Sequence, residues 1–334
     1  MIVSRTPYRI SFFGGGTDYP AHYLEHGGKV LATTINKYCY LSVRRLPAFF
    51  THKHRIVYSR TELVSSIEEI QHPSVRETLR YTGIDYGLSV HHDGDMPAHS
   101  GMGSSSAFTV GLLNSLHALE NRMASKRDLA CGAIHIEQRM IRENVGSQDQ
   151  TLSAYGGLNV VEFMTSGEIV VRPVILRPGA LRDLEDRLLL VFSGHSRNAS
   201  EIAAEQLRAL PDKLPAMTEM ARLVDRALEL LSADPPALDA FGALLNRTWE
   251  IKRELSPRIS TPAIDALHRA AMNGGALGGK LLGAGGGGCL LFYVRPEERA
   301  RLVRALDGYL VIPFRFDFDG SRIVVYEPAC DGDA

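Results

Sequence analysis

A segment rich in glycine and serine, residues 97–107, holds the residues best suited to bind an anion. Gly101 and Gly103 let the backbone pass close to a ligand, and apolar residues recur at helical spacing from Phe108 onward. A helix that begins at these serines would point its unpaired amides, and the positive end of its dipole, at whatever lies in front of it. The segment therefore predicts a polyphosphate site, although a glycine/serine linker that caps an ordinary helix has the same local pattern.

A carboxylate stands at an apolar position of the next predicted helix, which begins at Ser125. The apolar residues of this helix form a continuous stripe that a second row widens, and Glu137 occupies a gap in the second row. One interpretation is that Glu137 reaches solvent or pairs with Arg139 or Arg142. A partly buried carboxylate is unfavourable without a partner, however, and a bound cation is one such partner. Glu137 is therefore a candidate metal ligand.

Two further segments carry clusters of glycine. The first is the turn Gly14-Gly15-Gly16-Thr17-Asp18, which lacks the G-x-G-x-x-G spacing of dinucleotide-binding folds and is not followed by their ribose-binding acid. A dinucleotide-binding fold is therefore excluded here. The second is the glycine run 283–288, which follows Lys280. Because a helix and a strand are predicted on either side, the run favours close backbone approach over a loose hinge.

The elements that position these segments divide the chain into two halves, because Pro178-Gly179 breaks the pattern near residue 180. In the first half the pattern predicts strands at 9–13, 30–35, 38–44, 55–58, 86–92, 158–163 and 169–176, and helices at 104–122, 125–145 and 151–155. In the second half it predicts strands at 187–192, 289–294, 310–318 and 322–327, and helices at 198–209, 215–232, 235–256, 262–273 and 296–306. Lys280 would then lie at the end of a helix, and the glycine run would join that helix to the strand 289–294.

Three glycine-rich segments in this order resemble the GHMP kinase superfamily, named for its galactokinase, homoserine kinase, mevalonate kinase and phosphomevalonate kinase members. The resemblance covers nearly the whole chain. It implies an α+β fold of two domains, with an N-terminal ribosomal-protein-S5-like ATP-binding domain over residues 1–180 and a C-terminal ferredoxin-like domain over residues 181–334. It also implies ATP and Mg²⁺ as cofactors.

The resemblance further implies a role for each segment. As an isolated fragment Asp149 would be a helix cap, but it follows Glu137 by twelve residues in a Gly-x-x-Asp-Gln segment, as the catalytic Asp of galactokinases follows a metal-binding Glu. Asp149 would then be catalytic, Arg9 would neutralise developing charge, and Ser105 and Glu137 would hold Mg²⁺. The implied ATP contacts are Pro97, Gly101, Met102, Gly103, Ser104, Ser105 and Ser106. The implied substrate contacts are Gly15, Gly16, Thr17, Asp18, Gly285 and Gly286, with Lys29, Arg197 and Lys280 as candidates for a substrate phosphate.

The three-glycine turn before Thr17 and Asp18 departs from galactokinases, which have Gly-Glu-His there, and resembles the heptose-phosphate kinase and fucokinase branch. Asp18 would hold substrate hydroxyls. The branch implies a sugar 1-kinase that phosphorylates the anomeric hydroxyl of D-glycero-D-manno-heptose 7-phosphate to heptose 1,7-bisphosphate, for GDP-heptose and bacterial surface polysaccharides. A fucose or other hexose 1-kinase is the alternative within this class. A non-catalytic sugar-sensing relative is the alternative outside it, and the full set of metal and acid–base residues argues against a pure sensor.

The amino-acid composition limits the kinds of partner that we expect for this protein. The chain has 334 residues with 37 basic and 38 acidic side chains, so its net charge of −1 offers no general attraction for nucleic acid or an anionic membrane. The four cysteines are scattered and form no CxxC pair, which predicts neither a disulfide framework nor a zinc site. No signal-peptide core or membrane-spanning run is present. We expect a cytoplasmic protein whose partners are a sugar phosphate and ATP, and the sequence leaves open whether it forms a homo-oligomer.

Overall fold

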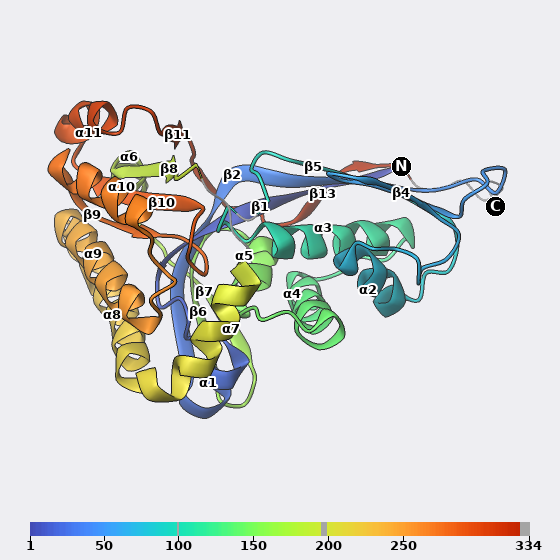
Figure 1. Cartoon of the computed structure of the whole chain (residues 1–334), viewed down its shortest axis with the longest axis horizontal. Helices are drawn as coiled ribbons and strands as arrows, with labels where there is room; N and C mark the ends of the chain where they lie inside the picture. The colour runs from blue at the N-terminus through green and yellow to red at the C-terminus, as the bar shows by residue number, and fades with distance from the viewer. Residues whose placement is uncertain (99, 195–198, 328–334) are drawn as a thin grey trace.

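The computed structural model describes residues 1–98, 100–194 and 199–327. Within these residues the strands form one nine-stranded sheet and one four-stranded sheet. Figure 1 shows the long sheet extending to one side of the molecule and the small sheet, with its own helices, at the other end. In the part of the chain that the structure describes, no helix is both long and apolar enough to cross a membrane.

The long sheet is built on two antiparallel strands, β1 (Ile2–Phe13) and β2 (Gly28–Arg45). β2 is a single strand where the sequence pattern predicted two, at 30–35 and 38–44. Its first part pairs with β6 (Leu158–Phe163), which pairs with β7 (Ile169–Pro173), and its second part pairs with β5 (Leu88–Gly94). Two short strands, β3 (His54–Val57) and β4 (Thr61–Val64), complete that edge. β1 pairs along β2 from Leu31 to Val43, so β2 continues across residues 36 and 37, where its other partner changes from β6 to β5. No local pattern could reveal this.

A layer of helices covers one face of the long sheet (Figure 1). Its centre is α3 (Ser104–Leu119), which packs against β1 and β2 and is buried along nearly all its length. Around α3 lie α2 (Pro73–Thr82), α4 (Lys126–His135), the π-helical turn η1 (Ile136–Ile141) and α5 (Gln148–Tyr155). The predicted helix 125–145 is therefore shorter than expected, because η1 ends in the left-handed residue Arg142. The helix α2 was not predicted.

The small sheet has the strand order β11-β8-β10-β9, with β8 at Leu188–Phe192, β9 at Ala276–Leu281, β10 at Cys289–Val294 and β11 at Leu310–Ile312. The helices of this part of the chain are α6 (Pro178–Asp186), α7 (Ala199–Ala209), α8 (Leu214–Ser232), α9 (Leu238–Leu255), α10 (Pro262–Asn273) and α11 (Arg299–Ala305). The sequence analysis was wrong about the residues before the glycine run. They form β9 rather than a helix end, and Gly278 and Gly279 within it weaken the strand pattern.

The end of the described chain returns to the long sheet. Strand β12 (Phe316–Asp317) pairs with β2, and β13 (Arg322–Tyr326) pairs with β1. A short helix after β1, α1 (Pro20–His26), follows the three-glycine turn. The domain boundary at residue 180 stays a prediction, and these last strands mean that residues of the second half also complete the first sheet.

Candidate active site

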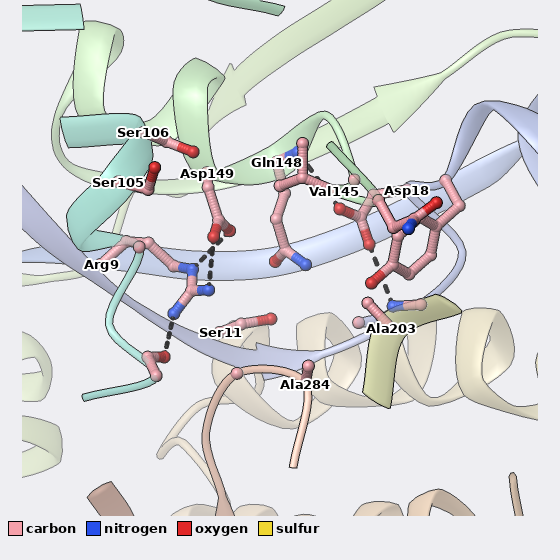
Figure 2. Close-up of a pocket in the computed structure, with 18 of the residues that line it drawn as sticks. Arg9, Ser11, Asp18, Ser105, Ser106, Val145, Gln148, Asp149, Ala203 and Ala284 are labelled. Atoms are coloured by element: carbon pink, nitrogen blue, oxygen red, sulfur yellow. Dashed lines mark hydrogen bonds and ion pairs between the residues drawn. The ribbon is translucent and has the colours of Figure 1, made fainter. Parts of the chain in front are cut away.

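One pocket gathers segments that are far apart in the sequence. It is lined by the end of β1 and the turn after it, the glycine/serine segment before α3, residues 143–149, and the start of the glycine run (Figure 2). The second half of the chain forms another wall of the pocket, with Lys252 and Leu255 of α9 and Ala203 of α7. The three glycine-rich segments singled out in the sequence therefore meet in one place.

The glycine/serine segment has the conformation that an anion-binding loop needs. Gly101 and Gly103 have left-handed φ values of +78° and +74°, and Ser104 begins α3. The Arg9 amide donates to the carbonyl of Met102 over 3.1 Å, which attaches the loop to β1. Gly101 and Gly103 line the pocket together with the serines 104–106. Of the implied ATP contacts, Met102 turns its side chain into the core, and Pro97 is not among the residues that line the pocket.

The glycine run supports this loop from behind. A Cβ on Gly283 would lie 2.6 Å from the Cα of Gly101, and a Cβ on Gly288 would lie 2.5 Å from the carbonyl oxygen of Ser100. The Cys289 amide donates to the same Ser100 carbonyl over 2.9 Å. Only glycine permits this contact between the two backbones, so the run marks close approach, as the sequence predicted.

The two glycines of the run that were implied as substrate contacts face another way. A Cβ on Gly285 would lie 2.8 Å from the Cα of Ile259, and the Gly286 amide donates to the Ile259 carbonyl. Gly283 and Ala284 line the pocket in their place.

An ion pair joins the two residues implied as catalytic. Arg9 of β1 donates from Nε to Oδ1 of Asp149 over 2.6 Å and from Nη2 to Oδ2 over 2.7 Å (Figure 2). Its Nη1 donates to the carbonyl of Gly101 over 2.6 Å. The Asp149 side chain is 15% exposed and lines the pocket from the first turn of α5, whereas that of Arg9 is 5% exposed. Bidentate pairing fixes the plane of the carboxylate at the pocket wall.

The carboxylate of Asp18 is almost fully buried on the other side of the pocket. It accepts from the amide of Gly16 over 3.0 Å and from the amide of Gln148 over 3.2 Å. Burial raises its pKa from the ordinary value, and the charge of Asp149 raises it further. The segment around Gly146 wraps so closely over Asp18 that a Cβ there would lie 1.9 Å from Oδ2. Asp18 and Asp149 thus face one cavity from two sides.

The remaining residues of the turn after β1 differ in role. Gly15 and Gly16 line the pocket, as expected of substrate contacts. Thr17 is buried and holds the turn together, because its hydroxyl donates to the carbonyl of Gly14 over 2.7 Å and accepts from the amide of Lys29 over 3.0 Å.

Glu137 lies beneath the serines of the loop, within η1. Its Oε2 accepts from the hydroxyl of Ser106 over 2.8 Å and from the side-chain amide of Gln150. Among the described residues no group donates to its Oε1, although the side chain is fully buried. Burial raises the pKa of Glu137 to about 7.

An unpaired buried carboxylate oxygen next to serine hydroxyls fits a magnesium ion, which takes oxygen ligands and few protein carboxylates. Ser105 is exposed on the pocket wall, while Ser106 is the serine that contacts Glu137. Among the described residues no cluster of three or more His, Cys, Asp or Glu side chains could hold a metal ion.

The three basic residues that were candidates for binding a substrate phosphate differ in their position relative to the pocket. Lys29 pairs with Asp225 over 2.7 Å at a partly exposed position and does not line the pocket. Lys280 lines the pocket and is buried, with Nζ donating to the carbonyls of Ser11 and Phe12 over 2.9 and 2.8 Å. Lys280 therefore does not lie at the end of a helix, because it belongs to β9, which places it inside. Arg197 lies outside the described residues.

Two family descriptions match the chain, the GHMP kinases N terminal domain over residues 69–157 and the GHMP kinases C terminal over residues 227–311. The chain belongs to the GHMP kinases. The fold is accordingly the two-domain α+β fold of this family. The first match includes the loop before α3, Glu137 and Asp149, and the second includes Lys252, Lys280 and the glycine run.

Three relatives place the chain within the GHMP kinases. A D-glycero-alpha-D-manno-heptose 7-phosphate kinase of Campylobacter jejuni is 26% identical over 339 residues, covering 96% of this chain and 98% of the relative. The crystal structure of a D-glycero-D-manno-heptose 1-phosphate kinase from Bacteroides thetaiotaomicron superposes with a TM-score of 0.80 over 98% of this chain and all of the other, at 24% identity. A bifunctional fucokinase/GDP-fucose pyrophosphorylase of Arabidopsis thaliana is 26% identical over 325 residues, or 89% of this chain and 30% of the relative.

Sequence reasoning missed two charged residues of this GHMP kinase pocket, Lys252 and Glu143. Lys252 interrupts the buried stripe of α9 between Trp249 and Leu255, which is the same signal that identified Glu137. Glu143 follows η1, and burial raises its pKa. Its irregular segment offers no periodic pattern, so no comparable signal was available for it.

Proposed function

We propose that this GHMP kinase is an ATP-dependent 1-kinase of D-glycero-D-manno-heptose 7-phosphate. The observation that carries the substrate is the likeness to the Campylobacter jejuni heptose 7-phosphate kinase along nearly the full length of both chains. The pocket supports it, because an anion-binding loop, an aspartate held by an arginine and a buried second aspartate face one cavity. The product would be heptose 1,7-bisphosphate, made in the cytoplasm where ATP is available.

In the proposed reaction, the amides of the loop before α3 bind the phosphates of ATP, as a helix N-terminus favours anions. Asp18 and the glycines of its turn hold ring hydroxyls of the sugar and orient its anomeric oxygen toward the γ-phosphorus. A bond forms between this oxygen and the phosphorus, and the bond to the bridging oxygen of ADP breaks. Asp149 accepts the proton of the anomeric hydroxyl, and ADP leaves with the electron pair.

Arg9 has two tasks in this scheme. Its bidentate pair with Asp149 holds the carboxylate in one orientation, so the accepting oxygen is placed before the sugar arrives. Its positive charge also lies beside the reacting atoms and offsets the charge that spreads over the phosphoryl oxygens. Ser105 and Glu137, with Ser106 between them, would hold Mg²⁺, which when bound neutralises the phosphate charges of ATP.

The test is a coupled assay of ADP release with heptose 7-phosphate, the unphosphorylated heptose and fucose. We expect the highest kcat/KM for heptose 7-phosphate, and product analysis should locate the new phosphate on the anomeric oxygen. Equal kcat/KM for the two heptoses would remove the 7-phosphate from the proposal. The alternative substrate is fucose, favoured by the likeness to the Arabidopsis thaliana bifunctional fucokinase. A higher kcat/KM for fucose would select it, and no ADP release with any sugar would favour the sugar sensor.

A further inference from the structure

Two lysines from different elements line the pocket, and the hydrogen bonds that hold them within the described residues go to main-chain carbonyls. Lys252 of α9 is 9% exposed and Lys280 of β9 is 3% exposed, and both line the pocket. We refer to Lys252 and Lys280 as the lysine pair. Lysine is seldom buried without an opposite charge, because removing its ammonium from water is unfavourable. The pair therefore calls for a physical explanation.

Main-chain carbonyls hold both ammonium groups but do not neutralise them. Lys252 Nζ donates to the carbonyl of Leu281 over 2.9 Å and to that of Gly283, and Lys280 Nζ donates to the carbonyls of Ser11 and Phe12. An ammonium has three donors, so each lysine keeps one for a ligand in the pocket. Within the described part of the chain, neither lysine forms an ion pair. The positive charge of Arg9 acts on both lysines, and that of Lys252 acts on Lys280.

The contacts of the pair place it at the reacting end of the pocket. Lys252 binds the carbonyl of Gly283, which packs on Gly101 of the phosphate loop. The carbonyl of Gly101 accepts from Arg9, which holds Asp149. A continuous series of contacts thus runs from Lys252 through the main chain of Gly283 and Gly101 to Arg9 and the proposed catalytic carboxylate.

We propose that the lysine pair is the subsite for the phosphoryl group that moves, binding it first as the γ-phosphoryl of ATP and then as the 1-phosphate of the product. This inference rests on the proposed kinase function and adds Lys252, which the sequence pattern did not reveal. The pair would supply the two positive charges that a phosphoryl dianion needs once water is displaced. Lysine suits this task as a mobile point charge that can follow the group during transfer.

The subsite should take up protons when it fills. Burial and the neighbouring positive charges lower the pKa of Lys252 to about 7 and that of Lys280 well below its ordinary value. At about pH 8 Lys252 is therefore largely neutral in the empty subsite, and a phosphoryl dianion favours its protonation. The other titratable side chains that line the pocket are Asp18, Tyr19, Glu143 and Asp149. A γ-phosphoryl would also favour protonation of the carboxylates among them, so only proton uptake that is lost with Lys252 belongs to the lysine pair.

The experiment is isothermal titration of the whole protein with AMP-PNP and with ADP, at about pH 8 and with excess Mg²⁺, so that the nucleotide phosphates are already deprotonated. Titration in two buffers of different ionisation enthalpy gives the number of protons taken up. We expect AMP-PNP to take up about one proton per site more than ADP, because only AMP-PNP fills the subsite. Equal uptake by the two nucleotides would overturn the proposal. Uptake that requires the sugar phosphate instead would also overturn it, and would assign the pair to the acceptor.

A variant and a matched control locate the effect. Lys252→Met should abolish the difference in proton uptake and lower kcat by ~10-fold or more while leaving the KM of the sugar nearly unchanged. Lys126→Met removes a lysine that also donates to two main-chain carbonyls but lies outside the pocket, and it should change neither kcat nor the difference in proton uptake. A Lys252→Met protein that keeps the full difference refutes the assignment. If that variant does not fold, Lys252→Arg gives the same test, because a guanidinium stays charged and takes up no proton. If AMP-PNP gives the expected proton uptake but no sugar is phosphorylated, the assignment of the subsite is supported and the proposed sugar substrate is refuted.

Discussion

The substitution Asp149→Asn separates the chemical role of Asp149 from its structural one. Asparagine keeps the shape of the side chain and removes its charge. In the structure both carboxylate oxygens accept from Arg9, at 2.6 and 2.7 Å. An asparagine can accept with only one of the two atoms and turns its NH₂ group toward a guanidinium donor. One charged hydrogen bond is lost, and Arg9 remains buried without a counter-charge.

The magnitude follows from the exposure of the pair. Losing one partner of a fully buried ion pair costs about 3–5 kcal/mol, whereas a single charged hydrogen bond contributes about 1.5–3 kcal/mol. The Asp149 side chain is 15% exposed at the pocket wall, so water can reach the site. We therefore expect a loss of about 2–3 kcal/mol in the free energy of unfolding. For catalysis, loss of an acid–base group lowers kcat by ~10² or more, which is at least about 2.7 kcal/mol in the barrier.

The assay measures kcat for ADP release and the free energy of unfolding in urea for the same protein preparations. Asp234→Asn is the matched control, because Asp234 also binds an arginine through both oxygens, at 2.9 and 2.6 Å, but on the surface. That variant should lose less than about 1 kcal/mol of stability and none of its activity. An Asp149→Asn protein that is folded and keeps kcat within about threefold of wild type would refute the catalytic role and leave Asp149 as the structural partner of Arg9.

Three further predictions concern other parts of the pocket. Glu137→Gln preserves volume and removes an anionic ligand, so the Mg²⁺ concentration for half-maximal activity should rise by ~10-fold with little change in the KM of the sugar, and unchanged metal dependence would place the metal elsewhere. Gly103→Ala introduces a backbone strain of roughly 1–2 kcal/mol at φ +74°. It should also lower kcat, because the new Cβ would lie 3.3 Å from both Arg9 and Asp149. Gly83→Ala is the control, since its φ of +70° carries similar strain with no atom within 4 Å, and equal effects on kcat would contradict the reasoning. The pKa of Lys252 is about 7 in the folded protein and 10.5 in the unfolded one. Between these two pH values, Lys252 therefore binds fewer protons in the folded protein than in the unfolded one. The free energy of unfolding of the wild type should therefore rise with pH across this window relative to Lys252→Met, and a difference that does not change with pH would contradict this.

Local patterns accounted for much of the site. The glycine/serine segment and the apolar spacing after it predicted the phosphate loop and α3, because a helix start is set by a few adjacent residues. A carboxylate in an apolar stripe marked Glu137, and the structure shows that it is fully buried with one unpaired oxygen. Asp149 needed the resemblance to a family as well, since a helix cap gives the same local sequence.

Strand pairing lay beyond such patterns. Whether residues 30–35 and 38–44 form one strand or two depends on which strands pair with them, and those strands lie far away in the sequence. The same limit explains β9, whose two central glycines have poor intrinsic preference for a strand. The neighbours β10 and α9 hold it in place, and with it Lys280.

The sequence by itself determined the family, the glycine/serine loop before α3, the acidic residues that we propose for the site and the existence of a glycine-mediated backbone contact. Those features depend on residue type and spacing within a few turns of the chain. Only the tertiary structure decided which basic side chains line the pocket. Lys29 is paired with Asp225, whereas Lys252 and Lys280 are buried at the pocket with carbonyl partners only. A lysine's role depends on which charges surround it after folding, and these come from elements that only the packed chain brings together.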